Sequence, residues 1–452
     1  MGQVAIVIGF VLVIFTLIDT FFTVMNYNQR GVLVNPAIAL EWRFIHWLVR
    51  PLNRRLRVGI YRALTGVILL SGIAIWVTGI LLGFALIYFG AMQMGHLHAG
   101  PGSPGGFVGA MYFSIAQFAT VGAIGMTPDA TLVSILSVSE TLISVLLLSL
   151  VITYLVNIFN AIEALRTLCA CFPSRYDYVT APLATLAPYL PREDKVSLET
   201  HLAATREAMN AYFDCIASDH SSIYFYSGKD RFSMPFAVFN IAGTLEGLKS
   251  GLPLNHPASK LPELERLLDS FESCRGQVYE LFRWPEPEGA KPVDSDTFVA
   301  RAEKAAALDG DLAVGPIPNA GFDHQAPLPA RLEQNLNLKR QWEEDHTEMF
   351  ESADQYISRF VKLRLVALRM SEIEPTNDWQ NEYQAYVDWL SFAPVADDFI
   401  RRTSHLFDYN PTYNLGEDAA NSPISLYGWQ AEDPVPPAVA AQKAQSSSAK
   451  KS

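Results

Sequence analysis

Residues 120–128 read Thr-Val-Gly-Ala-Ile-Gly-Met-Thr-Pro, and this stretch decides how the front of the chain folds. A short apolar segment, residues 106–119, precedes it, and a long apolar segment, residues 131–160, follows it. Two glycines and a proline in this setting predict a tight loop rather than a continuous helix. Irregular backbone at membrane depth is tolerated only where it is buried in protein or lines a water-filled path. The stretch therefore predicts a re-entrant loop behind a helix too short to span a bilayer.

Three segments are long and apolar enough to cross a bilayer, namely residues 4–25, 66–92 and 131–160. At the helical rise the first would cover about 33 Å, against roughly 30 Å for the hydrocarbon core. The first segment lacks the basic start and the cleavage site of a signal peptide, so we expect it to be retained as a helix. Half of the 452 residues are hydrophobic, which agrees with a partly membrane-embedded chain.

Charge divides the chain into two parts. Residues 1–171 carry a net charge of +3 and residues 172–452 a net charge of −15. The acidic part predicts a soluble domain and argues against nucleic acid as a partner. The loop between the first two spans has one acid, Glu41, against the arginines Arg30, Arg43, Arg50, Arg54, Arg55, Arg57 and Arg62. The next connection has no Lys or Arg, so the positive-inside rule places the N-terminus and residues 96–129 outside and the chain after about residue 160 in the cytoplasm.

Within the arginine-rich loop, residues 37–57 alternate apolar and cationic side chains at helical spacing. This pattern predicts an interfacial helix, with Trp42 and Trp47 as anchors and the arginines at the lipid headgroups. A plain connecting segment that only sets the topology is an equal alternative.

Residues 84–154 resemble the ion-channel domain of the bacterial two-helix-plus-pore-loop superfamily, to which potassium channels belong. The typical order is an Ala-x-Tyr-Phe-Ser pore helix, a Thr-Val-Gly-Tyr-Gly-Asp filter, and an inner helix with Leu-x-x-x-Glu-x-x-x-Gly-x-x-x-Leu. Here residues 110–114 read Ala-Met-Tyr-Phe-Ser and residues 120–122 read Thr-Val-Gly, followed by Leu136, Glu140, Ser144 and Leu148. The additional N-terminal span and the arginine-rich loop are similar to three-span members of the group.

The resemblance implies a homotetramer that conducts monovalent cations, with K⁺ as the first candidate, across the plasma (inner) membrane of a bacterium. Backbone carbonyls of one loop from each chain would replace the water shell of the ion. The implied selectivity filter consists of Thr120, Val121, Gly122, Ala123, Ile124 and Gly125. The implied supporting residues are Tyr112, Ser114 and Glu140, and Ser144 is a candidate gating hinge.

The filter departs from the family pattern after Gly122. Without a gap, Ala123 replaces the tyrosine, Ile124 the second glycine and Gly125 the acid. A β-branched residue fits poorly where a glycine lets carbonyls turn toward one axis, so this alignment predicts weak selectivity or no conduction. If one residue is inserted, Gly125 becomes the second glycine. Both alignments stay open, and neither restores the tyrosine or the acid.

Two polar residues of the predicted inner helix have alternative interpretations. We expect Glu140 to brace the pore helix from behind, through Tyr112 or Ser114, whereas the alternative is that it attracts cations to the axis. Ser144 stands where a hinge glycine is common in the family. A serine can bend a helix by bonding the carbonyl one turn back, but less freely than glycine allows.

Three further polar residues lie near the ends of the predicted spans. We expect Asp19 to pair with an arginine of residues 50–62 rather than to act in a proton or ion relay. His96 and His98 lie in a turn rich in Gly and Pro. We expect both to be solvated, and a metal site or a sensor of external pH is the alternative.

Residues 172–417 predict a helical cytoplasmic domain of no recognisable family. Candidate helices cover residues 192–217, 236–248, 261–282, 297–307, 329–370 and 377–403. Residues 285–328, which include one of these candidates, are rich in Pro, Gly and Asp and predict a loop or linker. Residues 418–452, rich in Ala, Pro, Ser and Lys, predict a disordered tail.

One candidate helix carries a heptad stripe, formed by Met349, Ala353, Tyr356, Phe360 and Leu363. A coiled coil around the symmetry axis of the tetramer would explain the stripe. It covers only about two heptads, however, so we favour packing inside a helical bundle.

The sequence contains none of the usual signatures of catalysis or of cofactor binding. It has no nucleotide-binding glycine motif, P-loop, zinc-protease motif or EF-hand loop. The cysteines Cys169, Cys171, Cys215 and Cys274 have neither zinc nor disulfide spacing, so we expect reduced thiols. We therefore predict no enzyme, no cofactor and no metal, and the partner or ligand of the cytoplasmic domain cannot be read.

These observations predict an all-α membrane protein with four parts. Residues 1–65 would form the N-terminal transmembrane helix and the interfacial segment, 66–165 the pore domain, 172–417 the cytoplasmic domain and 418–452 the tail. The first hypothesis is the pore-forming subunit of a homotetrameric cation channel gated by its cytoplasmic domain. The alternative is a membrane-anchored scaffold or sensor with a degenerate pore, supported by Ile124, the missing filter acid and the large soluble part.

Overall fold

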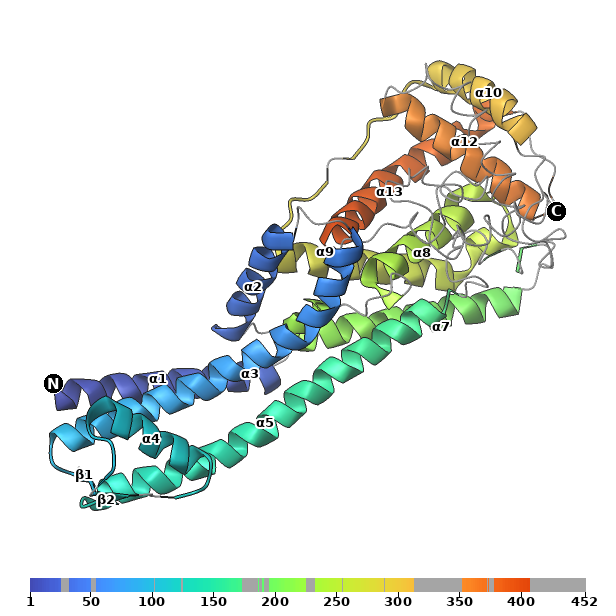
Figure 1. Cartoon of the computed structure of the whole chain (residues 1–452). Helices are drawn as coiled ribbons and strands as arrows, with labels where there is room; N and C mark the ends of the chain where they lie inside the picture. The colour runs from blue at the N-terminus through green and yellow to red at the C-terminus, as the bar shows by residue number, and fades with distance from the viewer. Residues whose placement is uncertain are drawn as a thin grey trace, which may run out of the picture. The chain divides into compact units, whose positions relative to one another are not determined.

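The computed structural model describes residues 1–25, 32–49, 54–100, 102–122, 125–172, 186, 189–190, 195–224, 232–253, 255–287, 289–312, 352–371, 373 and 378–406. The chain falls into two compact units (Figure 1). The first unit is Met1–Glu163 together with Phe213–Tyr226, and the second is Ala164–Tyr212 together with Ser227–Ser452. Two helices therefore continue from one unit into the other.

The first unit contains the long apolar helices α1 (Gly2–Met25), α3 (Arg54–Gln93) and α5 (Thr131–Ala170), the last of which ends in the second unit. Within the described residues, these three are the helices long and apolar enough to cross a membrane. The three predicted spans are confirmed as such helices. α3 begins earlier and α5 ends later than predicted, because the residues that flank their apolar stretches include no proline to stop a helix.

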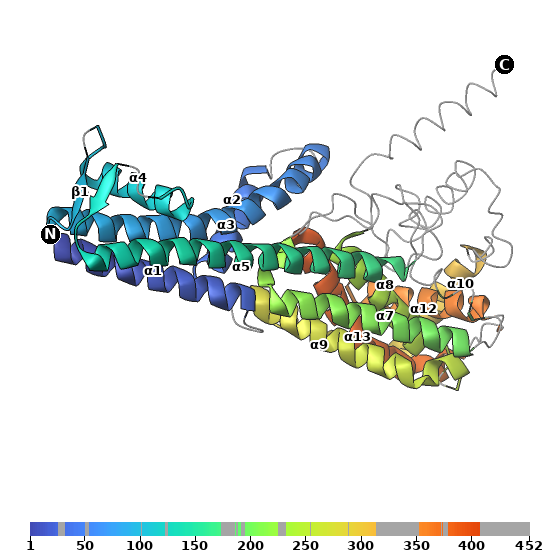
Figure 2. The same cartoon turned by 90° about the horizontal axis from the view of Figure 1, so that it is seen from below.

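α1 and α3 pack closely, and glycines make the close approach possible (Figures 1 and 2). A Cβ at Gly9 would lie 2.5 Å from the carbonyl oxygen of Gly83, and a Cβ at Gly83 would lie 2.5 Å from Cγ2 of Val13. Near the start of α1, Gly2 faces Gly90 at the far end of α3. The two helices are therefore antiparallel, and the N-terminus lies at the same end of the unit as the segment that follows α3.

We expect Gly83→Leu to lower the stability of the first unit by about 1–3 kcal/mol, because a side chain has no room between α1 and α3. Gly66→Leu on the same helix is the matched control, since no atom lies within 4 Å of a Cβ there. The measurement is the melting temperature of the detergent-purified protein. Equal melting temperatures for the two variants would contradict the close packing.

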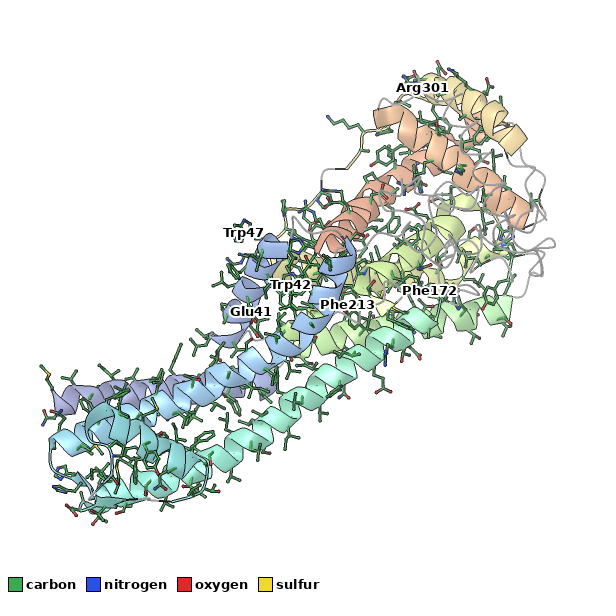
Figure 3. All side chains as sticks on the ribbon, in the orientation of Figure 1. Glu41, Trp42, Trp47, Phe172, Phe213 and Arg301 are labelled. Atoms are coloured by element: carbon green, nitrogen blue, oxygen red, sulfur yellow. The ribbon has the colours of Figure 1, made fainter. Side chains whose placement is uncertain are left out.

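The connection between α1 and α3 contains helix α2 (Val34–Val49). Its inner face buries Val34, Ile38, Trp42 and Val49, and its outer face exposes Leu40, Phe44, Trp47 and Leu48. Trp42 is 3% exposed and Trp47 69% exposed (Figure 3). The helix predicted over residues 37–57 is present as α2 up to Val49, and from Arg54 the chain belongs to α3. Residues 50–53 lie outside the described residues.

Between α3 and α5 lie a short strand β1 (Leu97–Ala99), helix α4 (Gly106–Phe118) and a short strand β2 (Met126–Pro128). The strands pair antiparallel, with Leu97 opposite Pro128 and Ala99 opposite Met126. The described part of the chain is mostly helical, which is consistent with the predicted all-α class, and this two-stranded ribbon is an addition that was not predicted. Three-residue strands carry too little alternating pattern to be recognised in a sequence.

The second unit is a helical bundle. Its helices are α7 (Lys195–Ser218), α8 (Met234–Glu246), a π-helical turn η3 (Gly247–Gly251), a 3₁₀ turn η4 (Pro257–Lys260), α9 (Pro262–Phe282), α10 (Ser295–Leu312), α12 (Ser352–Met370) and α13 (Trp379–Leu406). Every residue of α8 is buried, so this helix is the centre of the bundle. The last residues of α7 belong to the first unit.

Most helices predicted for the second unit occur within a few residues of their expected bounds. The prediction of a loop over residues 285–328 is wrong where α10 lies, because Ser295–Leu312 includes a helix-forming run of Ala, Glu, Lys and Arg. The first part of the helix predicted over residues 329–370 lies outside the described residues, as do residues 418–452.

The described part of the heptad stripe packs within the bundle. Phe360 and Leu363 are fully buried, and the ring of Phe360 contacts Phe298 of α10 and Tyr386 of α13. Met349 and the side chain of Ala353 lie outside the described residues. Packing within the chain, as predicted, accounts for this part of the stripe without a coiled coil.

Buried ion pairs join α12 to its neighbours in the second unit. Arg359 contacts Glu246 of α8 at 3.2 Å and Asp397 of α13 at 2.5 Å. Arg364 pairs with Glu382 of α13. Burial raises the pKa of Glu246 while the Arg359 guanidinium lowers it. Buried charges are tolerated only when they are paired in this way, so the pairs specify how α12 docks.

Candidate functional site

The short apolar helix α4 starts in a glycine-rich turn. Gly105 precedes its first residue, and Gly106 has a φ of +65°, a conformation that favours glycine. One turn into α4, a Cβ at Gly109 would lie 2.0 Å from the carbonyl oxygen of Pro104. The turn therefore brings the chain back onto the first turn of α4 in a way that only glycine permits.

A buried carboxylate ties α4 to both long helices beside it. Glu140 of α5 is 0% exposed, and its Oε1 accepts a hydrogen bond from the Ser114 hydroxyl of α4 at 2.6 Å. Its Oε2 accepts a hydrogen bond from the Tyr88 hydroxyl of α3 at 2.7 Å. The Ser114 hydroxyl also lies 3.1 Å from the carbonyl oxygen of Leu81 in α3. Both carboxylate oxygens are thus satisfied inside the protein, so Glu140 holds three helices together.

Of the two partners that the sequence suggested for Glu140, the structure pairs it with Ser114. Tyr112 is 41% exposed and lies elsewhere on α4. The second partner, Tyr88, was missed. The signal for it was a tyrosine within an apolar span, because a buried phenol usually finds a hydrogen-bond partner. Its ring also packs edge-on against Phe113, with the centroids 4.8 Å apart.

We expect Glu140→Leu to speed hydrogen exchange of the α4 amides about tenfold or more. The change removes the acceptor of Tyr88 and one acceptor of Ser114, and a buried unsatisfied hydroxyl costs about 1–3 kcal/mol. Ser137→Ala is the control, because the Ser137 hydroxyl bonds only the Ser134 carbonyl of its own helix. Unchanged exchange of α4 in Glu140→Leu would show that the carboxylate does not hold this helix.

The end of α4 leads directly into the predicted filter. The amide of Val121 donates to the carbonyl of Ala116 and the amide of Thr120 to that of Gln117, both at 2.9 Å. This pair of bonds is the Schellman motif, in which the αL position is usually a glycine. Here Thr120 occupies it with a φ of +59°, a strained conformation for a β-branched residue. From α5, the Thr141 hydroxyl also donates to the Gln117 carbonyl, at 3.3 Å.

Of the described residues of the predicted filter, Thr120, Val121 and Gly125 are exposed and Gly122 is half-buried. Val121 is 62% exposed, and Gly122 has a φ of +91° with no atom within 4 Å of a Cβ. Gly125 has a φ of +69°. Ala123 and Ile124 lie outside the described residues, so the two alignments of the filter both remain open.

The candidate hinge, Ser144, lies within a continuous α5. Its hydroxyl donates to the carbonyl of Thr141 at 2.8 Å, and the residue is 7% exposed. This is a bond to the preceding turn, of the kind that serine makes inside helices.

The buried Asp19 of α1 has partners that the sequence did not suggest. Its Oδ2 accepts a hydrogen bond from the indole Nε1 of Trp76 in α3 at 3.0 Å, and its Oδ1 accepts one from the amide of Leu33 at 2.6 Å. The side chains of Arg54, Arg55, Arg57 and Arg62, like residue 50, lie outside the described set, so the predicted arginine pair stays a prediction.

Near the turn after α3, His98 and Asp129 form an exposed ion pair at 2.5 Å. The prediction of a solvated histidine is consistent with a His98 side chain that is 59% exposed. Within the described residues, no cluster of three or more His, Cys, Asp or Glu could hold a metal ion.

A segment beyond α7 also belongs to the first unit, and sequence reasoning missed it. In the turn η1 (His220–Tyr224), the Ser221 hydroxyl lies 3.1 Å from the Tyr154 hydroxyl of α5. The Tyr224 ring contacts that of Trp42 in α2. The buried Asp219 accepts hydrogen bonds from the amide and the hydroxyl of Ser221. The segment has no motif of its own, so only its packing identifies it.

Burial raises the pKa of Asp219 to about 6, while hydrogen bonds from Ser221 lower it. The packed conformation of residues 219–224 favours the neutral carboxyl of Asp219. The stability that the segment gains from this preference is fully present below the ordinary pKa of about 3.9 and is lost as the pH rises through 6. We expect residues 219–224 to open about tenfold more often at pH 8 than at pH 5, measured by hydrogen exchange corrected for the intrinsic rate. Asp219→Asn should remove this difference, and Asp214→Asn, which changes an exposed acid on α7, should keep it. A pH difference that persists in Asp219→Asn would assign it to another group.

No protein-family model and no curated protein matches this sequence, and no solved structure matches its fold.

Proposed function

We propose that this chain is the pore-forming subunit of a homotetrameric cation channel. One observation carries the proposal: a helix too short to span, α4, is held between two long apolar helices and leads directly into residues 120–122, of which Thr120 and Val121 are exposed. A buried carboxylate with two hydroxyl partners is a specific means of fixing such a helix at membrane depth. Irregular backbone there is tolerated where it lines a water-filled path.

The charge of the permeating ion follows from the loop. The C-terminal end of α4 leads into it, and the dipole of a helix is negative at that end. Residues 119–128 contain no charged side chain, so ion contacts would come from carbonyl oxygens. Both features favour a cation. K⁺ is the first candidate because of the Thr-Val-Gly start, and the degree of selectivity over Na⁺ is left to measurement.

Assembly into a tetramer follows from the single loop in each chain, because a ring of carbonyls needs four such loops around one axis. α5 has the apolar surface for it. Eight of its large apolar side chains are 56–68% exposed in the single chain: Leu132, Ile135, Val138, Leu142, Val145, Leu146, Leu148 and Phe159. In the assembly, this surface would face neighbouring copies, the pore or lipid.

The proposed orientation combines packing with charge. The N-terminus and the loop lie at one end of the first unit, because Gly2 of α1 faces Gly90 of α3. The arginine-rich connection follows the opposite end of α1 and would be cytoplasmic. The pore loop would then open to the outside of a bacterial plasma membrane, with the second unit inside.

The second unit would gate the pore through α5. This helix carries Glu140 beside α4 and Tyr154 beside Ser221 of the segment that follows α7. α7 starts in the second unit and ends in the first. A movement of the helical bundle would therefore be transmitted along α7 to the segment around Ser221, which contacts α5. The stimulus itself is left open.

The test is the flux of K⁺, Na⁺ and N-methyl-glucamine through the purified protein in liposomes. We expect flux of small cations in the wild type and none in Gly122→Asp, because a carboxylate would occupy the ring of carbonyls. Gly95→Asp is the matched control, since Gly95 also has a left-handed φ, +72°, and no atom within 4 Å of a Cβ.

Equal flux in both aspartate variants would show that this loop does not line the pore. No flux of any ion in the wild type, at several values of pH and with the protein still tetrameric, would favour the membrane-anchored scaffold or sensor.

A further inference from the structure

The loop that contains the filter is closed at its outer end by contacts between the chain before α4 and the chain after the filter. We name these contacts the outer clamp and define it as β1, β2, Gly100, Ser103 and Gly125. Strand β1 pairs with β2, and beyond β2 the amide of Asp129 donates to the carbonyl of His96 at 3.1 Å. Leu97 and Met126, one from each strand, are 2% exposed. The clamp is therefore anchored on its inner side although its tip is exposed.

The carbonyl of Gly125 is the point at which the clamp meets the filter. It accepts a hydrogen bond from the amide of Gly100 at 2.7 Å and another from the hydroxyl of Ser103 at 2.9 Å. A carbonyl oxygen has two lone pairs, and these two donors use both. Both donors belong to the segment before α4. The Gly125 carbonyl is therefore engaged by its own chain and not available to an ion.

The conformation of Gly125 is suited to this engagement. Its φ is +69°, and a Cβ there would lie 2.2 Å from Oγ of Ser103. The amide of Ser103 in turn donates to the carbonyl of Gly100 at 3.0 Å, which holds both donors in one turn. Residue 125 must be a glycine for the serine hydroxyl to reach its carbonyl.

We propose that Ser103 is a positioning residue of the filter: with the Gly100 amide, its hydroxyl holds the Gly125 carbonyl in the outer clamp, so that this carbonyl is not an ion ligand. The inference rests on the proposed channel function and deepens it. Under either alignment of the filter, Gly125 ends the ion-binding stretch and sets where its outer end is anchored. Ser103 acts through Gly125 and does not touch the ion.

The proposal has a direct consequence for selectivity. A carbonyl released from the clamp can rotate toward the axis, and its loop gains freedom to fit ions of different size. Selectivity among cations depends on the number and the spacing of the carbonyls that replace the water shell. Loss of the Ser103 hydroxyl should therefore change the ratio of K⁺ to Na⁺ permeability. A change in total flux with an unchanged ratio would not support the proposal.

The experiment compares Ser103→Ala, Ser103→Thr and Thr127→Ala with the wild type, each as the full-length protein. The threonine variant keeps the hydroxyl. Thr127 of β2 is an exposed neighbour whose hydroxyl takes no part in the outer clamp, so its alanine variant is the matched control. One readout is the reversal potential of reconstituted protein under opposed K⁺ and Na⁺ gradients. The other is hydrogen exchange of peptides that contain residues 99–104 and 125–130.

We expect Ser103→Ala to change the K⁺/Na⁺ permeability ratio about fivefold and to speed exchange in both peptides, as loss of one net hydrogen bond implies. Ser103→Thr and Thr127→Ala should match the wild type in both readouts. An unchanged ratio in a conducting Ser103→Ala protein would overturn the proposal, and so would unchanged exchange.

The two readouts separate this inference from the channel hypothesis. If the wild type carries no current, the channel function fails, and with it the role in selectivity. The clamp itself is then judged by exchange alone. Faster exchange in Ser103→Ala but not in Thr127→Ala would keep Ser103 as the residue that closes the loop.

Discussion

The carboxylate of Glu140 is the interaction on which the packing of α4 against α3 and α5 depends. An unpaired carboxylate inside an apolar helix packing would be strongly destabilising, so its position is acceptable only with donors on both oxygens. Ser114 and Tyr88 supply them from two other helices. The same contacts that satisfy the charge therefore fix the depth and the direction of α4. The residues directly after α4, which include the strained Thr120, follow the direction that this contact gives to the helix.

A second constraint is the close approach of α1 and α3. Glycines remove the side chains that would separate the two helices, and the Asp19–Trp76 hydrogen bond fixes them near the other end of α1. Helix association in a membrane gains little from the hydrophobic effect, so close packing and buried hydrogen bonds must supply the specificity. Because these contacts fix α1 against α3, the N-terminus lies at the same end of the unit as the segment that follows α3. The proposed topology uses this geometry as well as the arginine count.

α5 connects the two regions of interest along one helix. It carries Glu140 beside α4 and Tyr154 beside the segment around Ser221, and it continues into the second unit. The sequence pattern predicted the helix itself and a bracing role for Glu140, with Tyr112 and Ser114 as alternative partners. It did not predict the partner Tyr88, the contact with Ser221 or the outer clamp. Each of these pairs residues far apart in the chain, and neither Tyr88 nor the short strands carry a periodic signal of their own.

The sequence by itself determined the three long apolar helices, the short helix before Thr-Val-Gly and most helices of the second unit. Hydrophobic length and helical periodicity are local properties, so they can be read without knowledge of the fold. The tertiary structure alone decided which side chain is the hydrogen-bond partner of each of these polar groups. Tyr88 donates a hydrogen bond to Glu140, Trp76 to Asp19, and the Ser103 hydroxyl to the carbonyl of Gly125. A hydrogen bond depends on a few tenths of an ångström between distant segments, and only packing sets such distances.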